Sequence, residues 1–189
     1  MSSPARRTFD LLIVGGGIAG LSAAITAAEA GRSVAVITKE PSLFDSNTRW
    51  AQGGIVGESA EDTPELLERD ILEAGSGINS VDAVRQLVKE GPPLTKSFLG
   101  EKIGVPFTRG DNGDPALTIE AAHSVRRILY AKDTTGEAIQ SSLIRYVNGV
   151  SGISVFVDHT VVDLITNVHN STDPQEKYRR TRVIGAYAH

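Results

Sequence analysis

The sequence predicts an α/β fold in which helices flank a parallel sheet, and three observations near the start of the chain carry this prediction. Leu11 to Val14 is a continuous apolar run, as in a buried parallel strand. An alanine-rich helical pattern follows and stops at Gly31, and Ser33 to Thr38 supplies a second apolar strand. This order is typical of the first unit of a Rossmann-like dinucleotide-binding domain.

The predicted turn between the first strand and the helix matches the pattern G-x-G-x-x-G at Gly15, Gly17 and Gly20. The first glycine permits the tight turn, the second lets a pyrophosphate approach the backbone, and the third lets helix and strand pack closely. The phosphates would lie at the helix N-terminus, where unpaired N–H groups favour an anion. A secretory signal or a membrane span would compete for the same apolar run, but Asp10 and three consecutive glycines argue against both.

The composition argues against several classes of partner and site. The net charge of −4, without a basic patch that contains aromatic residues, gives no reason to expect nucleic acid or a membrane as a partner. Cysteine is absent, which excludes disulfides and thiolate sites and fits a cytoplasmic location. The four histidines show no metal-ligand spacing, so no metal is expected.

The remaining elements follow from periodicity and turn residues. Lys39 to Gly57 is expected to be a long loop across a ligand. A helix should begin at Thr63, which precedes Pro64, and end near Gly75. Further predicted elements are helices at 80–90, stopped by Gly91-Pro92-Pro93, at 94–99, at 123–131 and at 134–147, and strands at 103–107, 153–157, 161–165 and 183–187.

Three segments carry a family resemblance. They are residues 15–24, then Ser-Asn-Thr-Arg-Trp-Ala-Gln-Gly-Gly-Ile at 46–55, then Glu-Ala-Ala-His-Ser-Val-Arg-Arg-Ile-Leu at 120–129 with Asp133 and Thr135-Gly136. In this order and spacing the set resembles the L-aspartate oxidases, flavoenzymes of the succinate dehydrogenase and fumarate reductase flavoprotein superfamily. The resemblance spans nearly the whole chain.

The resemblance implies a fold, a cofactor and a reaction. It implies non-covalent FAD, oxidation of L-aspartate to iminoaspartate, and transfer of the electrons to oxygen or fumarate, as the first step of NAD biosynthesis. Residues 1–189 would form the N-terminal part of the FAD-binding domain, with a β-rich C-terminal segment. Because the chain stops within an apolar strand, we expect it to be a fragment. The resemblance implies that the capping domain and the proton-transfer arginine lie outside it, so we expect the chain to be inactive alone.

The resemblance also assigns cofactor contacts by position. The glycine turn would line the pyrophosphate, Lys39 would reach the adenosine, the loop 47–54 would wrap the flavin, and the backbone at 160–161 would contact the adenine. The predicted FAD-binding residues are Gly15, Gly16, Gly17, Ile18, Ala19, Gly20, Lys39, Asn47, Thr48, Arg49, Trp50, Ala51, Gln52, Gly53, Gly54, Thr160 and Val161.

Two departures from common patterns bear on this assignment. A dinucleotide fold usually ends its second strand with an acid for the ribose, whereas Thr38-Lys39 stands here, as is typical of the resembled superfamily. Succinate dehydrogenases attach the flavin through a histidine, and Asn47 holds the matching position. Since an amide cannot form that bond, Asn47 favours the oxidase, which lacks this means of raising the flavin potential.

Glu120 is the predicted catalytic-site residue. In the resembled family the matching acid orients aspartate, and a carboxylate suits the substrate's α-ammonium group. Ala121 and Ala122 replace two glycines of the family motif, so we expect the local backbone to differ. A purely structural or solvated Glu120 is the alternative.

Other residues near these motifs have weaker assignments. Arg126 and Arg127 are expected to be ion-pair residues on a helix surface. His123 could support the flavin or substrate pocket, or be structural, and Trp50 could pack in the core or contact the flavin. Two alternative functions are a fumarate reductase or succinate dehydrogenase-like flavoprotein and a non-catalytic module that binds NAD.

Overall fold

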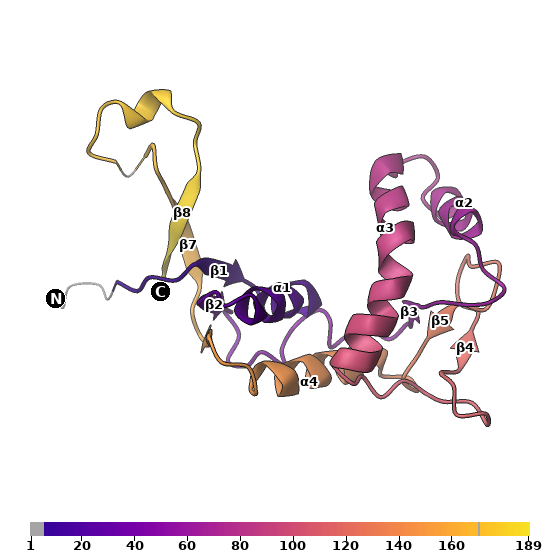
Figure 1. Cartoon of the computed structure of the whole chain (residues 1–189). Coiled ribbons are helices and arrows are strands. Elements are labelled where there is room, and N and C mark those ends of the chain that lie inside the picture. Colours follow the sequence, from indigo (N-terminus) through magenta and orange to yellow (C-terminus); the bar gives the residue numbers. More distant parts are fainter. Residues whose placement is uncertain (1–5, 170) are drawn as a thin grey trace. The chain divides into compact units, whose positions relative to one another are not determined.

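The computed structural model describes residues 6–169 and 171–189, and the chain divides into two compact units (Figure 1). The first unit contains the chain up to Ser46 and from Ile144 onward, and the second contains Asn47–Leu143. The second unit is therefore an insertion into the first along the sequence.

A three-stranded parallel sheet forms the centre of the first unit, in the order β1-β2-β6. These strands are β1 (Leu11–Val14), β2 (Val34–Ile37) and β6 (Ile153–Phe156), and α1 (Ile18–Glu29) contacts all three. The predicted parallel pairing is confirmed. The prediction that both faces of the first strand are covered is wrong, because β1 lies at the sheet edge with Val14 60% exposed, whereas every residue of β2 is buried.

Asp10 links the beginning of β1 to the beginning of β2 by hydrogen bonds to Ser33. Its Oδ2 accepts hydrogen bonds of 2.8 Å from both the backbone N–H and the Oγ of Ser33. These hydrogen bonds hold the pKa of Asp10 below its ordinary value. The charged residue at the start of the apolar run thus has a structural role at the sheet.

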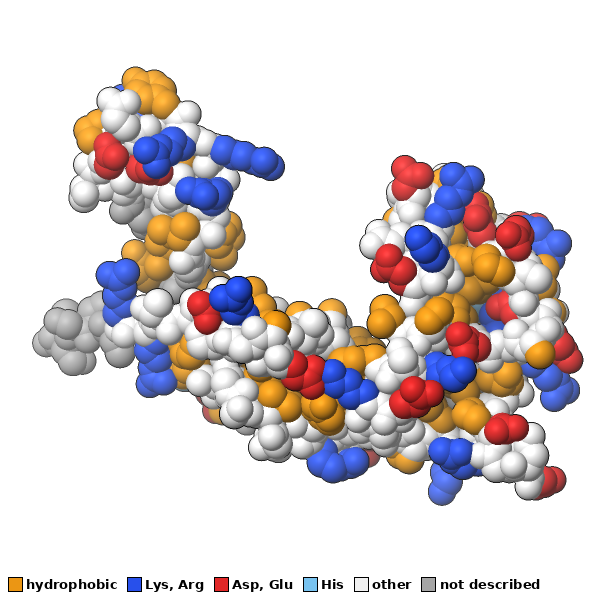
Figure 2. All heavy atoms as spheres, viewed as in Figure 1, with side chains coloured by type: hydrophobic (Ala, Val, Ile, Leu, Met, Phe, Trp, Pro, Cys, Tyr) orange, Lys and Arg blue, Asp and Glu red, His pale blue; other side chains and the backbone are white. Residues whose placement is uncertain are grey.

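The last part of the first unit is a two-stranded antiparallel sheet of β7 (Val161–Thr166) and β8 (Val183–Ala188), joined through the short 3-10 helix Glu176–Tyr178. Both predicted strands are confirmed. Figure 2 shows hydrophobic side chains gathered along these strands. The exposed ones are Val162, Leu164, Val183, Ile184 and Tyr187.

The second unit combines helices with a small antiparallel sheet of order β3-β5-β4. The helix α2 (Pro64–Ala74) begins as predicted, because Oγ1 of Thr63 accepts a hydrogen bond from the backbone N–H of Leu66. A core of Leu67, Val84 and Val88 joins α2 to the next helix. The remaining elements are α3 (Val81–Leu94), β3 (Ile55–Val56), β4 (Leu117–Thr118) and β5 (Ile128–Leu129).

The predicted helix stop at Gly91-Pro92-Pro93 is wrong. The helix α3 continues through both prolines and leads directly into a π-helix, Thr95–Lys102, which overlaps the short helix predicted at 94–99. The prolines remove the α-helical N–H donors to the carbonyls of Val88 and Lys89, four residues earlier. The helix nevertheless continues in the wider π form, where Thr95 Oγ1 donates to the Gly91 carbonyl at 3.1 Å and Ser97 Oγ donates to the Pro93 carbonyl at 2.8 Å.

Two further predictions are corrected. Residues 103–107 bury Ile103, Val105 and Phe107 alternately, as a strand would, but the Val105 N–H bonds to the Leu99 carbonyl and no strand ladder forms there. Residues 123–131 are not helical, because Ile128–Leu129 pairs with both β3 and β4. For Ile128–Leu129, burial in the sheet outweighs the helical pattern of the local sequence.

The helix α4 (Thr135–Val147) confirms the predicted helix at 134–147. Among residues 6–169 and 171–189, no helix has both the length and the apolar character needed to cross a bilayer.

Candidate cofactor and substrate site

The predicted pyrophosphate turn lies at the carboxyl ends of the parallel strands. The Gly15 N–H donates to the Ile37 carbonyl at 2.8 Å, which joins the end of β1 to the end of β2. A Cβ on Gly20 would overlap the Gly15 carbonyl oxygen, so only glycine allows this close approach of helix and turn. No side chain caps α1 and its first turn contains no acid. This helix N-terminus therefore fits an anionic diphosphate.

The two segments predicted to contact adenosine lie side by side in the first unit. The His159 N–H donates to the Thr38 carbonyl and the Asp158 N–H to the Glu40 carbonyl, each at 3.0 Å. These bonds place Lys39 next to the residues that precede β7. The Thr160 N–H and carbonyl are both hydrogen-bonded to His189, and Val161 pairs with Ala188 in β7 and β8. Their predicted adenine contacts stay predictions.

The predicted flavin loop, residues 47–54, belongs to the second unit. Its turns are closed by hydrogen bonds of 3.2 Å from the Trp50 N–H to the Asn47 carbonyl and from the Ala51 N–H to the Thr48 carbonyl. Gly136, in the first turn of α4, donates its N–H to the Ala51 carbonyl at 2.9 Å. A Cβ on residue 136 would overlap the Thr48 and Ala51 carbonyls, so glycine at this position allows the loop to pack against α4.

Glu120 joins two of the motif segments. Its Oε2 accepts a hydrogen bond of 3.0 Å from the Gly54 N–H, so the half-buried carboxylate lies against the glycines of the predicted flavin loop. Ala121 has a φ of 49°, in the left-handed region that the family's glycine would favour. Ala121 holds this conformation at a cost of about 1 kcal/mol, and the expected difference from the family's backbone stays a prediction.

Trp50 is not a core residue. Its side chain is 68% exposed, and the Arg49 guanidinium lies 4.6 Å from the ring centroid. The core-packing alternative for Trp50 is therefore wrong, and contact with the flavin stays a prediction.

Arg127 is buried, which overturns its expected place on a helix surface. It is 0% exposed, with Nη1 2.8 Å from Asp70 Oδ2 and Nη2 2.8 Å from Asp62 Oδ1. Asp62 precedes the N-cap of α2 and Asp70 lies in the second turn of that helix. Arg126, which precedes it, is exposed. Arg127 is thus an ion-pair residue of the interior.

The buried cluster of Asp62, Asp70 and Arg127 also contacts His123 and Ser124 of the motif. Both the N–H and the Oγ of Ser124 donate to Asp70 Oδ2, at 2.8 and 2.7 Å. Arg127 Nη1 also lies 3.2 Å from His123 Nδ1. Burial opposes ionisation of Asp70, but the hydrogen bonds from Ser124 and Arg127 outweigh it and lower the pKa of Asp70 to about 2.

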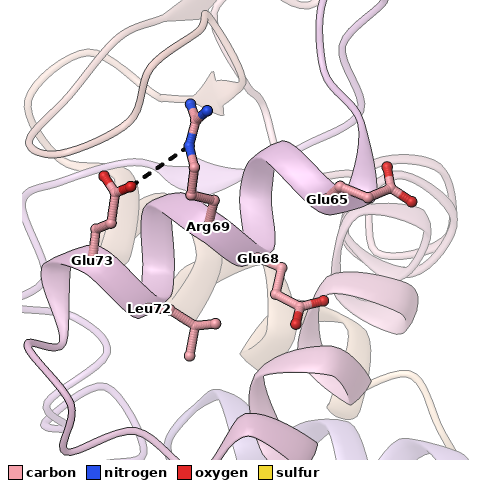
Figure 3. A pocket seen from close by; sticks show the side chains of 5 residues that line it. All are labelled: Glu65, Glu68, Arg69, Leu72 and Glu73. Atoms are coloured by element: carbon pink, nitrogen blue, oxygen red, sulfur yellow. Dashed lines mark ion pairs between the residues drawn. The ribbon is translucent and has the colours of Figure 1, made fainter.

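Sequence reasoning did not identify Asp62 and Asp70. Asp70 follows Leu67 by three residues and shares its buried face of α2, and an acid on an apolar stripe signals a buried partner. The opposite face of the same helix forms a shallow groove (Figure 3). Arg69 and Glu73 pair there at 3.8 Å, and none of the predicted site residues lines the groove.

The geometry therefore defines a dinucleotide-binding protein whose glycine turn fits a diphosphate. Residues 10–189 match the family model of the FAD binding domain, and the chain belongs to that family. The predicted cofactor, FAD, is confirmed, and the alternative of a module that binds NAD is not supported.

Curated relatives identify the branch that the chain resembles. It is 41% identical over 160 residues to the L-aspartate oxidase of Halobacterium salinarum, covering 85% of this chain and 31% of the relative. It is 36% identical over 166 residues to the chloroplastic L-aspartate oxidase of Arabidopsis thaliana, covering 87% of this chain and 25% of the relative. The predicted resemblance is confirmed, and the chain spans about a quarter to a third of the length of these relatives.

A solved structure agrees with the fold. The chain matches FrdA of E. coli quinol fumarate reductase, solved with an E245Q mutation, with a TM-score of 0.82 and 28% identity, covering 95% of this chain and 29% of that one. The predicted α/β class is confirmed.

Proposed function

We propose that the chain supplies the FAD-binding part of an enzyme that oxidises L-aspartate to iminoaspartate. The electrons pass to oxygen or fumarate, and the reaction is the first step of NAD biosynthesis in the cytoplasm. The observation that carries this proposal is the hydrogen bond from Gly54 to Glu120, which joins the two segments that most resemble the L-aspartate oxidases. The names of the curated relatives support it.

The chain's own residues have distinct parts in this proposal. The N-terminal turn of α1 holds the pyrophosphate of FAD, and the loop 47–54 contacts the flavin. The Gly54 N–H fixes one oxygen of Glu120, so the carboxylate is oriented before it binds the α-ammonium group of aspartate. FAD held there would supply the two-electron acceptor for substrate oxidation.

We assign the α-proton base and the cations that bind the substrate carboxylates to segments outside this sequence. Arg127 of the motif could in principle bind a substrate carboxylate. Its side chain is fully buried and paired with two aspartates, so it is not available to the substrate. The 189-residue chain alone should therefore show no aspartate turnover. Turnover by the purified chain would contradict this assignment.

The cofactor is tested first by heat-denaturing the purified chain and identifying any flavin in the supernatant by absorbance and chromatography. We expect released FAD, because Asn47 cannot form the covalent bond. Colour that remains in the precipitate would overturn non-covalent binding, and a chain that neither contains nor takes up FAD would overturn its role as an FAD-binding part.

The substrate is tested in a chimera in which this chain replaces the matching segment of the Halobacterium relative. We expect peroxide formation that depends on L-aspartate, and its loss in Glu120→Leu. The similarity to quinol fumarate reductase favours fumarate reduction as the second candidate function. Reduction of fumarate by a reduced dye, without aspartate oxidation, would support that candidate instead.

A further inference from the structure

The contact between Arg127 and His123 determines which imidazole nitrogen holds the proton. Arg127 Nη1 lies 3.2 Å from His123 Nδ1 and 2.8 Å from Asp70 Oδ2. A guanidinium only donates hydrogen bonds and keeps its protons in proteins, so Nδ1 must be the acceptor. We propose that Arg127 holds His123 as the neutral Nε2–H tautomer, and that Arg127 and Asp70 are positioning residues for this imidazole.

The surroundings of Arg127 keep the donor in place. The guanidinium is 0% exposed and lies between Asp62 and Asp70, and Ser124 holds Asp70 with two hydrogen bonds. Moving Arg127 away from His123 would leave buried charges without partners. The planar guanidinium also reaches both carboxylates and the imidazole at once, which a lysine ammonium does not match.

The position of His123 bears on the candidate site because its backbone N–H donates to the Glu120 carbonyl at 3.2 Å, which closes the turn that contains Ala121. Arg127 therefore anchors the side chain of a residue whose backbone holds the Glu120 turn. The bearing of this anchoring on substrate binding rests on the proposed function.

His159 provides an internal control, because the partner of its Nδ1 is a hydrogen-bond acceptor, whereas the partner of His123 Nδ1 is a donor. The Nδ1 of His159 is hydrogen-bonded to the Val157 carbonyl, which can only accept. His159 Nδ1 therefore carries a proton. One spectrum of the same protein should show an unprotonated Nδ1 on His123 and a protonated Nδ1 on His159.

The test is the long-range ¹H–¹⁵N spectrum of the histidine rings in the ¹⁵N-labelled chain at mildly alkaline pH, assigned with His123→Gln and His159→Gln. We expect His123 to show a protonated Nε2 and an unprotonated Nδ1. A protonated Nδ1, or signals averaged over both tautomers, would overturn the proposal from the parent protein alone. The measurement needs neither aspartate nor turnover, so its failure is distinct from failure of the proposed function.

Asp70→Asn tests the positioning role. We expect His123 in this variant to populate both tautomers, with its two ring ¹⁵N shifts moving toward each other. The exposed Asp82→Asn, in the first turn of α3, is the matched control and should leave the His123 signals unchanged. A folded Asp70→Asn chain with the parent's His123 spectrum would refute the role of Asp70.

Discussion

The Asp70→Asn substitution removes a buried carboxylate but keeps an oxygen to accept from Ser124. In the parent chain the pKa of Asp70 falls from 3.8 to about 2, because hydrogen bonds from Ser124 and Arg127 outweigh the effect of burial, which opposes ionisation. The unfolded chain therefore binds this proton more readily than the folded chain. The stabilisation from Asp70 is fully present above about pH 4 and is lost as the pH falls toward 2.

The magnitude follows from the two pKa values. Their difference, at about 1.4 kcal/mol per unit, corresponds to about 2 kcal/mol of unfolding free energy. In Asp70→Asn this contribution is absent, and Arg127 keeps Asp62 at 2.8 Å as its charged partner. We expect the variant to be less stable at neutral pH by at least about 2 kcal/mol. The gap to the parent should narrow by about 2 kcal/mol as the pH falls from about 5 to about 2.

The assay is urea unfolding followed by far-ultraviolet circular dichroism over this pH range, with the parent, Asp70→Asn and the exposed Asp82→Asn. The control should stay within about 1 kcal/mol of the parent at every pH, which is the size of the helix-dipole effect of an acid in a first turn. A gap between parent and Asp70→Asn that stays constant as the pH falls would refute the reasoning, because it would mean that the folded-state pKa of Asp70 is not lowered.

Three further substitutions test other parts of the site. Ala121→Gly relieves the left-handed backbone and should raise the unfolding free energy by up to about 1 kcal/mol in urea titrations, whereas a loss of stability would contradict the strain at φ 49°. Gly20→Ala should abolish FAD retention by the purified chain, since its Cβ would overlap the Gly15 carbonyl. Glu120→Gln keeps an acceptor for the Gly54 N–H and should retain FAD while the chimera loses at least about tenfold in aspartate oxidation; unchanged oxidation would leave Glu120 a structural residue.

The first unit was largely predictable because its signals are local. The apolar run Leu11–Val14, the glycine turn and the second run around Val34–Ile37 lie next to one another in sequence, and each favours one structure. The start of α2 was predictable for the same reason, since Thr63 and Pro64 specify a helix N-terminus by themselves. Exposure of Val14 was not predictable, because it depends on which strands flank β1.

The predictions that were wrong have different causes. Gly91-Pro92-Pro93 is a strong local stop, but the chain widens into a π-helix directly after it and stays helical. Ile128–Leu129 has helical surroundings in sequence, and only pairing with β3 and β4 makes it a strand. Glu120 and the loop 47–54 were found through the family resemblance, whereas periodicity alone does not bring them together.

The wrong prediction of a helix at 123–131 and the wrong prediction of a surface position for Arg127 are related. The sequence predicts a surface helix for Arg126 and Arg127, but the chain bends at 124–126 before it enters β5, and the two side chains lie in different environments. Arg126 is accordingly exposed and Arg127 is 0% exposed. A buried guanidinium requires carboxylates, and an acid on the apolar face of α2 requires a buried cation. Asp70 and Arg127 are each partnered by opposite charge, and an acid on the apolar face of α2 is the signal from which a buried cation, and a non-helical segment around Arg127 packed against α2, could have been inferred.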